Sequence, residues 1–188
     1  MTALDETFAE LTERLSTPTL LDAKRSDPVF YFVFDPGQAL EVKSRVPLWA
    51  ARLREDDGWV VSALSLSRIA REIIDRSGHW NEWVTHEANF DAEQINASIS
   101  DVLSQALIDR LVPYLTTPSP SALYFLTDVE MLHPYFRIHA LESQLHDRIK
   151  VPAVIFYPGR RSGASGLSFL GIYPVDGSYR STLIGGVL

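Results

Sequence analysis

Two short runs of apolar residues constrain the fold of this chain more than any other feature of its sequence. Residues 28–36 read PVFYFVFDP and residues 151–158 read VPAVIFYP. A strand with one face in water alternates between apolar and polar side chains, whereas a strand covered on both faces is apolar throughout. The first run therefore predicts a strand buried on both faces, as in parallel sheets, and the second run predicts another strand.

Helix-like segments alternate with strand-like runs along the rest of the chain. Two more strands are predicted at residues 59–66 and 123–127. Helical spacing of apolar residues, or a position directly after a strand, predicts helices over about residues 4–15, 38–54, 66–74, 99–111 and 138–149. Strands that alternate with helices imply right-handed crossovers and a mainly parallel sheet flanked by helices. We therefore expect a single three-layer α/β domain over residues 1–188.

The tail of the chain, from residue 163 to residue 188, has a different pattern. It is rich in glycine, and its side chains alternate in the way that is typical of antiparallel strands. The residues PVDG at positions 174–177 are turn formers. The tail therefore predicts a C-terminal β-hairpin that turns around these residues.

Charge and cysteine content exclude several classes of function. The net charge is −7, which is the wrong sign for a protein that grips a phosphate backbone with its general surface, so no direct nucleic-acid binding is expected. There is no cysteine, which rules out disulfides, thiolate metal sites and a cysteine nucleophile. The first residues are acidic where a signal peptide is basic, and no apolar run approaches the ~20 residues of a membrane span. We therefore expect a cytoplasmic protein with no membrane contact.

Polar side chains follow the predicted strands at the points where the strands end. They are Asp35 after the first strand, Thr127 and Asp128 after the third, and Tyr157 and Gly159 at the end of the fourth. The carboxyl ends of parallel strands meet at one edge of a sheet, which is where α/β proteins bind ligands. These residues are therefore the candidates for a ligand or partner site.

The phosphate-binding motifs are absent or incomplete. The loop DPGQALE after the first strand has one glycine, no lysine at the required place and an acid that would repel phosphate. The run GRRSGASG at residues 159–166 has the glycines and arginines of an anion-binding nest, but it leads into a strand and not into a helix. An ordinary hairpin is the favoured interpretation of that run, and an anion site is the alternative.

The histidines are not spaced as helical metal ligands. His79 and His86, like His139 and His146, are seven residues apart, and His133 lies six residues before His139. A zinc pair on one helix turn requires a spacing of four. The histidine spacing therefore predicts no metal site.

Two other groups of residues have open interpretations. Asp35 and Asp128 could hold Mg²⁺ as paired carboxylates, but an acid at a strand end more often caps the next turn. Trp80 and Trp83, near Phe90, form either an exposed anchor for a protein partner or a satellite cluster that packs under a loop.

A longer pattern spans the third and fourth predicted strands and resembles a known family. The order FLTDVEMLHPYFRIHALESQL, then VPAVIFYPG, then LSFLG is similar to the BrxB family of bacterial BREX phage-defence systems. Matching positions include Thr127, Pro134, Arg137 and His139. The chain departs from the family pattern at Asp128, where members often have glycine, and in the loop after Gly159.

The resemblance implies a fold, a setting and partners. It implies an α/β domain akin to P-loop NTPases but without the nucleotide-binding loop, and a component with no established catalytic activity. The expected direct partner is the phosphatase-like protein PglZ, with BrxC and PglX in a larger complex. Arg137 would pair with a carboxylate such as Asp35 or Asp128, and with His139 it would fix the connection between strand and helix.

Two hypotheses follow from these observations. The first is a non-catalytic adaptor that binds PglZ, needs no cofactor and supports assembly of the defence and host-DNA methylation complex. The alternative is a metal-dependent enzyme that processes nucleotides or nucleic acid with Asp35, Asp128 and His139.

Overall fold

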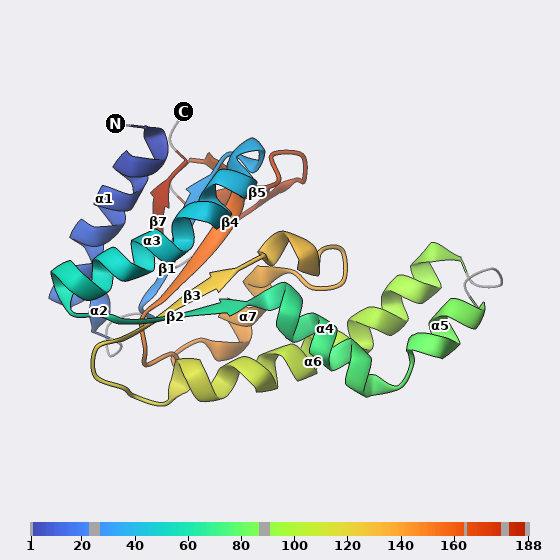
Figure 1. Cartoon of the computed structure of the whole chain (residues 1–188). Coiled ribbons are helices and arrows are strands. Elements are labelled where there is room, and N and C mark those ends of the chain that lie inside the picture. The colour runs from blue at the N-terminus through green and yellow to red at the C-terminus, as the bar shows by residue number, and fades with distance from the viewer. Residues whose placement is uncertain (1, 23–26, 87–90, 164, 178–180, 187–188) are drawn as a thin grey trace.

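The computed structural model describes residues 2–22, 27–86, 91–163, 165–177 and 181–186, and within them it shows one mainly parallel sheet between two layers of helices (Figure 1). Five strands form the central path in the order β2-β3-β4-β1-β7, and all neighbours on this path are parallel. Their bounds are β1 Val29–Phe34, β2 Val60–Ser65, β3 Ala122–Thr127, β4 Ala153–Ser162 and β7 Thr182–Gly185. The prediction of an α/β domain with a mainly parallel sheet is confirmed.

The two apolar runs form the middle of the sheet. Every residue of β1 is buried, and so are the first seven residues of β4. β1 pairs with β4 on one side, in a register that sets Val29 beside Ala153, and with β7 on the other side. Strands in this position have helices over both faces and no face in water, which is why neither run contains alternating polar residues.

One layer of helices packs on one face of the sheet. It contains α1 Ala3–Leu15, the short α2 Pro18–Leu21 and α3 Ala39–Asp57. A capping box between Thr2 and Asp5 begins α1, and α3 continues through Pro47 without a break. The ring of Trp49 stacks on Phe8 of α1 at 5.2 Å, so α1 and α3 share one core with the sheet.

A second layer covers the opposite face. It contains α4 Leu66–Ser77, α6 Ala92–Thr116 and α7 Ile138–Leu145, the last of which follows the short 3-10 helix η2 Val129–Leu132. Buried leucines of these helices pack against β1 and β4 side chains such as Tyr31 and Ile155. Ser65 begins α4, because its hydroxyl accepts a hydrogen bond from the Arg68 amide.

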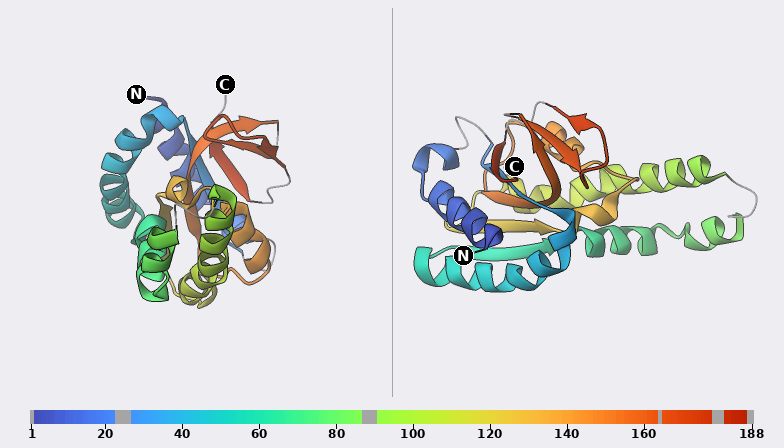
Figure 2. Two further views of the ribbon diagram at one scale, coloured as in Figure 1. Left: turned by 90° about the vertical axis from the view of Figure 1, so that its right-hand side faces the viewer. Right: turned by 90° about the horizontal axis from the view of Figure 1, so that it is seen from above.

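Part of this second layer extends beyond the sheet as a helical arm. Figures 1 and 2 show α4 and α6 running side by side away from the sheet, with α5 Trp80–His86 at the far end. α6 has 25 residues and begins at the capping residue Asp91, well before the predicted start near residue 99. Its first turns lie in the arm, where few side chains are buried, so this part of the sequence carries no strong apolar period.

The two tryptophans fit different interpretations of the sequence: Trp83 packs in a satellite cluster, and Trp80 is exposed. Trp83 is buried and donates a hydrogen bond from Nε1 to Ser98 Oγ at 2.9 Å, so it packs α5 onto α6. Trp80 is 57% exposed. Phe90, the third aromatic residue of the predicted group, lies outside the described residues.

The tail contains antiparallel strands as predicted, but the strands and turns lie at other positions than expected. β5 Gly166–Phe169 pairs antiparallel with the end of β4, and β6 Val175–Asp176 pairs antiparallel with β5. The residues expected to form the turn, 174–177, therefore include a strand. β7 then returns to the central sheet and pairs parallel with β1, where it buries Ile184 in the core. None of the helices in the described part of the chain is long and apolar enough to span a membrane.

Candidate functional site

Asp128 stands at the carboxyl edge of the sheet, directly after β3. Its side chain is 7% exposed, and its Oδ2 accepts hydrogen bonds from Ser65 Oγ at 2.5 Å and from Thr127 Oγ1 at 3.2 Å. Its Oδ1 lies 2.5 Å from Lys43 Nζ of α3, a charge-assisted contact that compensates the charge of the carboxylate. Three elements, β2, β3 and α3, thus meet at this carboxylate.

The backbone at Asp128 explains how aspartate can stand at a position where the resemblance implies glycine. Its φ is +61°, in the left-handed region. Glycine adopts this region without steric cost, and aspartate is among the few other residues that visit it routinely. The aspartate therefore keeps the backbone turn and adds a charge at the strand end.

Electrostatics keep the Lys43–Asp128 pair ionised at neutral pH. Burial raises the pKa of Asp128, but hydrogen bonds from Lys43 and Ser65 and the charge of Lys43 outweigh burial, so its pKa lies below the ordinary value. The hydrogen bond to Asp128 raises the pKa of Lys43 despite some desolvation. The pair is therefore a charged contact that links α3 to the end of β3.

Asp35 has a separate role at the end of β1. Its Oδ1 accepts a hydrogen bond from the Gly37 amide at 2.8 Å and so begins the 3-10 helix η1 Pro36–Gln38, which follows β1 where a phosphate loop would stand. Its Oδ2 lies 3.6 Å from Arg160 Nη2, an exposed pair. The capping interpretation of Asp35 is confirmed. The one group of three potential metal ligands found in the described residues contains neither Asp35 nor Asp128.

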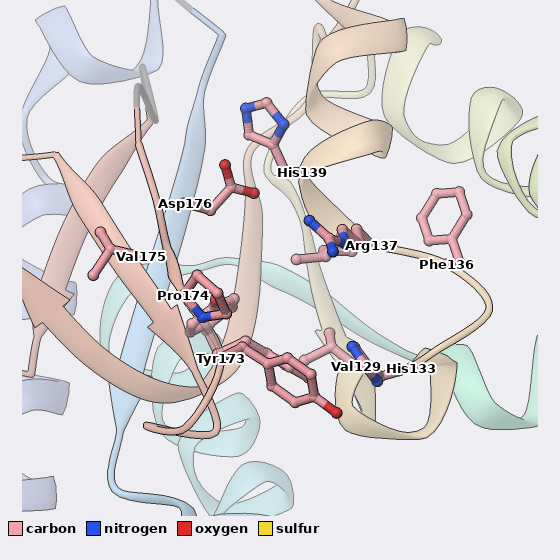
Figure 3. A pocket seen from close by; sticks show the side chains of 12 residues that line it. Val129, His133, Phe136, Arg137, His139, Tyr173, Pro174, Val175 and Asp176 are labelled. Atoms are coloured by element: carbon pink, nitrogen blue, oxygen red, sulfur yellow. The ribbon is translucent and has the colours of Figure 1, made fainter.

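A pocket of about 130 Å³ lies beside this edge, between the start of α7 and the β5–β6 hairpin (Figure 3). We call it the aromatic pocket. Its lining residues are Val129, His133, Phe136, Arg137, Ile138, His139, Tyr157, Phe169, Tyr173, Pro174, Val175 and Asp176. It brings together three of the predicted site residues, Arg137, His139 and Tyr157. A second pocket, of about 110 Å³, is lined by the polar or charged residues Lys43, Thr127, Asp128 and Glu130 and by apolar residues.

The lining of the aromatic pocket contains both aromatic rings and charged side chains. The His133 ring lies 4.1 Å from the Tyr173 ring and 5.6 Å from the Phe169 ring, measured between centroids. Arg137 and His139 line the pocket from the α7 side, whereas Asp176 lines it from the hairpin side. Burial and the positive charge of Arg137 lower the pKa of His133, so this ring is neutral at pH 7.

The expected pairing of Arg137 with Asp35 or Asp128 is wrong. The ion pair of Asp128 is with Lys43, and that of Asp35 is with Arg160. Arg137 instead precedes α7 as an exposed residue at the pocket. The two helices, α3 and α7, lie on opposite faces of the sheet. Lys43 reaches the end of β3 from the α3 face, whereas Arg137 lies on the α7 face.

Tyr157 and Gly159 build one wall of the pocket from β4. The Tyr157 ring is buried and packs edge-on against Tyr31 and Phe169. Gly159 lies in β4 and pairs with Phe169 of β5, which confirms the hairpin interpretation of the run that begins at Gly159. A Cβ atom at Gly159 would lie 2.4 Å from the Ser168 carbonyl oxygen and 2.7 Å from the Tyr157 ring.

Gly159→Ala is therefore expected to destabilise the protein by about 1–3 kcal/mol, because backbone and ring must both shift to admit a methyl group. Gly177→Ala is the control, since no atom of the described residues lies within 4 Å of a Cβ atom there, and its effect should stay within about 0.5 kcal/mol. Urea denaturation of both variants measures the difference. Equal unfolding midpoints would contradict the close packing at Gly159.

No local sequence pattern pointed to several of the residues at this edge. Lys43 lies on a helix with other charged residues, and the tail residues Phe169, Tyr173 and Asp176 lie in a segment predicted only as a hairpin. Their roles depend on pairing between β4, β5 and β6 and on how α3 packs over the sheet. Neither feature is encoded in the spacing of neighbouring residues.

Comparison with known proteins identifies a family. The family described as "BREX protein BrxB" matches residues 62–184, a range that begins within β2, ends within β7 and includes the helical arm, the aromatic pocket and Asp128. No curated protein and no solved structure matches the chain. Because the family match covers well over half of the 188 residues, the chain belongs to the BrxB family.

Proposed function

We propose that the chain is a non-catalytic adaptor that binds PglZ and supports assembly of the defence and host-DNA methylation complex in the cytoplasm. The observation that carries the proposal is the BrxB match over residues 62–184, because membership of this family makes the chain a component of a BREX phage-defence system. BrxC and PglX are the expected further members of the complex.

The geometry of the carboxyl edge supports an adaptor over an enzyme. A metal-dependent enzyme of the alternative kind would use Asp35 and Asp128 as free carboxylates. Asp128 instead forms an ion pair with Lys43 and accepts a hydrogen bond from Ser65, and Asp35 caps η1. A metal ion would have to displace the Lys43 ammonium group from a buried carboxylate, which costs the energy of that ion pair.

The helical arm offers a surface for the partner. Trp80 and Val84 are 57% and 53% exposed and lie four residues apart on α5, so they share one face of that helix. Tryptophan is enriched among residues that contribute most to protein–protein binding. We infer that this face of α5 contacts PglZ, and that Arg137 at the aromatic pocket is a second contact.

The test is co-purification of PglZ with the untagged chain and with two surface variants. Wild-type protein should form a complex at micromolar concentration. Trp80→Ala should weaken binding by roughly 30-fold if Trp80 is a binding hot spot, and the charge reversal Arg137→Glu should weaken it if the aromatic pocket takes part.

Leu48→Ala is the matched control for the arm, because Leu48 is 69% exposed on α3, in the other layer of helices. Circular dichroism of each variant checks that the fold is retained. Absence of a complex between wild-type protein and PglZ would refute the adaptor. Equal loss of binding in the Trp80 and Leu48 variants would refute the arm as the contact surface.

A further inference from the structure

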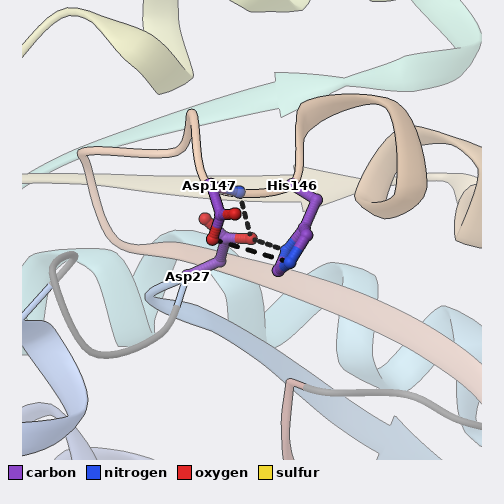
Figure 4. Close-up of side chains that lie close together, drawn as sticks. All are labelled: Asp27, His146 and Asp147. Carbon is purple, nitrogen blue, oxygen red and sulfur yellow. Dashed lines mark hydrogen bonds and ion pairs between the residues drawn. The ribbon is translucent and has the colours of Figure 1, made fainter.

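Three metal-binding side chains meet at the amino edge of the sheet, opposite the edge that carries Asp128. Asp27 precedes β1, and His146 and Asp147 lie in the connection between α7 and β4 (Figure 4). β1 and β4 are parallel neighbours, and the Ala153 amide donates a hydrogen bond to the Pro28 carbonyl oxygen. The segments that lead into the two strands are therefore held together.

The distances within this group are short. Asp27 Oδ2 lies 2.9 Å from His146 Nδ1 and accepts a hydrogen bond from the Asp147 amide at 3.1 Å. His146 Nε2 lies 3.5 Å from Asp147 Oδ1. One ligand atom from each of the three residues lies within 4.8 Å of the other two, so small side-chain rotations would bring three ligand atoms around one ion.

The charge on Asp27 is incompletely compensated by the protein. Its side chain is only 7% exposed, and its Oδ1 is buried and accepts no hydrogen bond from the residues that the structure describes. A buried carboxylate oxygen without a partner is unfavourable, and the second carboxylate of Asp147 adds negative charge beside it. A bound cation would compensate both carboxylates at once.

We propose that Asp27, His146 and Asp147 bind a divalent transition-metal cation of the Zn²⁺ type. One imidazole nitrogen with two carboxylate oxygens suits Zn²⁺, whereas Ca²⁺ and Mg²⁺ prefer sites made of oxygen alone. The side chain of His146 is 41% exposed and that of Asp147 is 84% exposed, so the ion can enter from solvent and keep water ligands. It would join the residues before β1 to those before β4.

The histidine spacing gave no sign of this site. Asp27 is 119 residues from His146, and the two meet only because β1 and β4 pair. The prediction of no metal site rested on pairs of histidines along one helix, and this group contains a single histidine. The site lies apart from the arm and the aromatic pocket, so the proposal is independent of PglZ binding.

Isothermal titration of the untagged chain with Zn²⁺ tests the proposal. We expect saturable binding of one ion per chain. The melting temperature should rise by roughly 5–10 °C when the free Zn²⁺ concentration is a hundred times Kd. His146→Gln and Asp147→Asn should each weaken binding by about tenfold or more, since the first removes the imidazole nitrogen and the second removes the charge of a carboxylate ligand. Mg²⁺ should bind far more weakly than Zn²⁺.

His79→Gln is the matched control, because His79 also lies beside an acid, Glu82, but belongs to no group of three potential ligands among the described residues. It should bind Zn²⁺ as the wild type does. Asp147 has a φ of +61°, which asparagine tolerates, so Asp147→Asn remains informative even if the His146 variant folds poorly. Absence of saturable binding, or unchanged affinity in Asp147→Asn, would overturn the proposal.

Discussion

Replacing Trp49 by alanine should lower the free energy of unfolding by about 3–5 kcal/mol, the largest effect that we expect from a single substitution in this chain. Trp49 is 6% exposed, and its ring stacks on Phe8 at 5.2 Å and on Phe156 at 6.0 Å, with Phe32 at 5.1 Å. These rings belong to α1, α3 and the two central strands. Alanine would leave a cavity where all four elements meet.

Urea and thermal denaturation measure the loss. For a chain of this size the melting temperature should fall by roughly 10 °C. Trp80→Ala is the matched control, since it removes the same side chain from an exposed position and should change stability by less than about 0.5 kcal/mol. If the two variants unfolded at the same urea concentration, the Trp49 cluster would not be the core of the α1–α3 layer.

Asp128→Ala should have the second largest effect, a loss of about 2–4 kcal/mol. It removes the ion pair with Lys43 and the acceptor of the Ser65 hydroxyl, and it places alanine at a φ of +61°. Lys43 is 60% exposed, so water can hydrate its ammonium group once the carboxylate is removed. The expected loss of stability is therefore smaller than for a fully buried ion pair. Chemical denaturation at pH 7 measures the loss.

Asp128→Asn separates charge from shape, because asparagine accepts hydrogen bonds and tolerates the left-handed backbone. The pKa of Asp128 is lowered in the folded protein, so its charge stabilises the fold above the unfolded-state pKa of about 3.9. That contribution is lost as the pH falls through the lower, folded-state pKa. The stability gap between wild type and Asp128→Asn should therefore be largest near neutral pH and close in acid. A gap that stays constant down to acid pH would contradict a role for the charge.

The Asp128→Asn variant also bears on the alternative function. If the chain were a metal-dependent enzyme that used this carboxylate, the variant would lose Mg²⁺-dependent turnover. An adaptor should bind PglZ equally well with either residue, because Asp128 is buried at the edge of the sheet and not on the arm. Measuring both properties on one variant separates the two functions.

The two central strands, β1 and β4, could be predicted from the sequence because burial on both faces requires an unbroken apolar run. In β1 every position is apolar, and the amphipathic period of α1 identifies its buried face, Leu4, Phe8, Leu11 and Leu15. The family could also be recognised, because the pattern from Phe125 to Gly171 is ordered along the chain, and the match over residues 62–184 confirms it. The first half of α6 was harder to predict, because it lies in the arm and buries few side chains.

The tertiary structure alone decided which distant residues meet. The return of β7 to β1, the reach of Lys43 to Asp128 and the meeting of Asp27 with His146 all join positions far apart in sequence. The spacing of apolar residues along a helix or strand indicates which side chains face the core, and this spacing can be read from residues that are close together in the sequence. Contacts between strand ends depend on sheet order and register, and no local pattern carries that information. The sequence by itself therefore determined the class of fold and the family, and the three-dimensional arrangement determined which charged residues from distant parts of the chain meet.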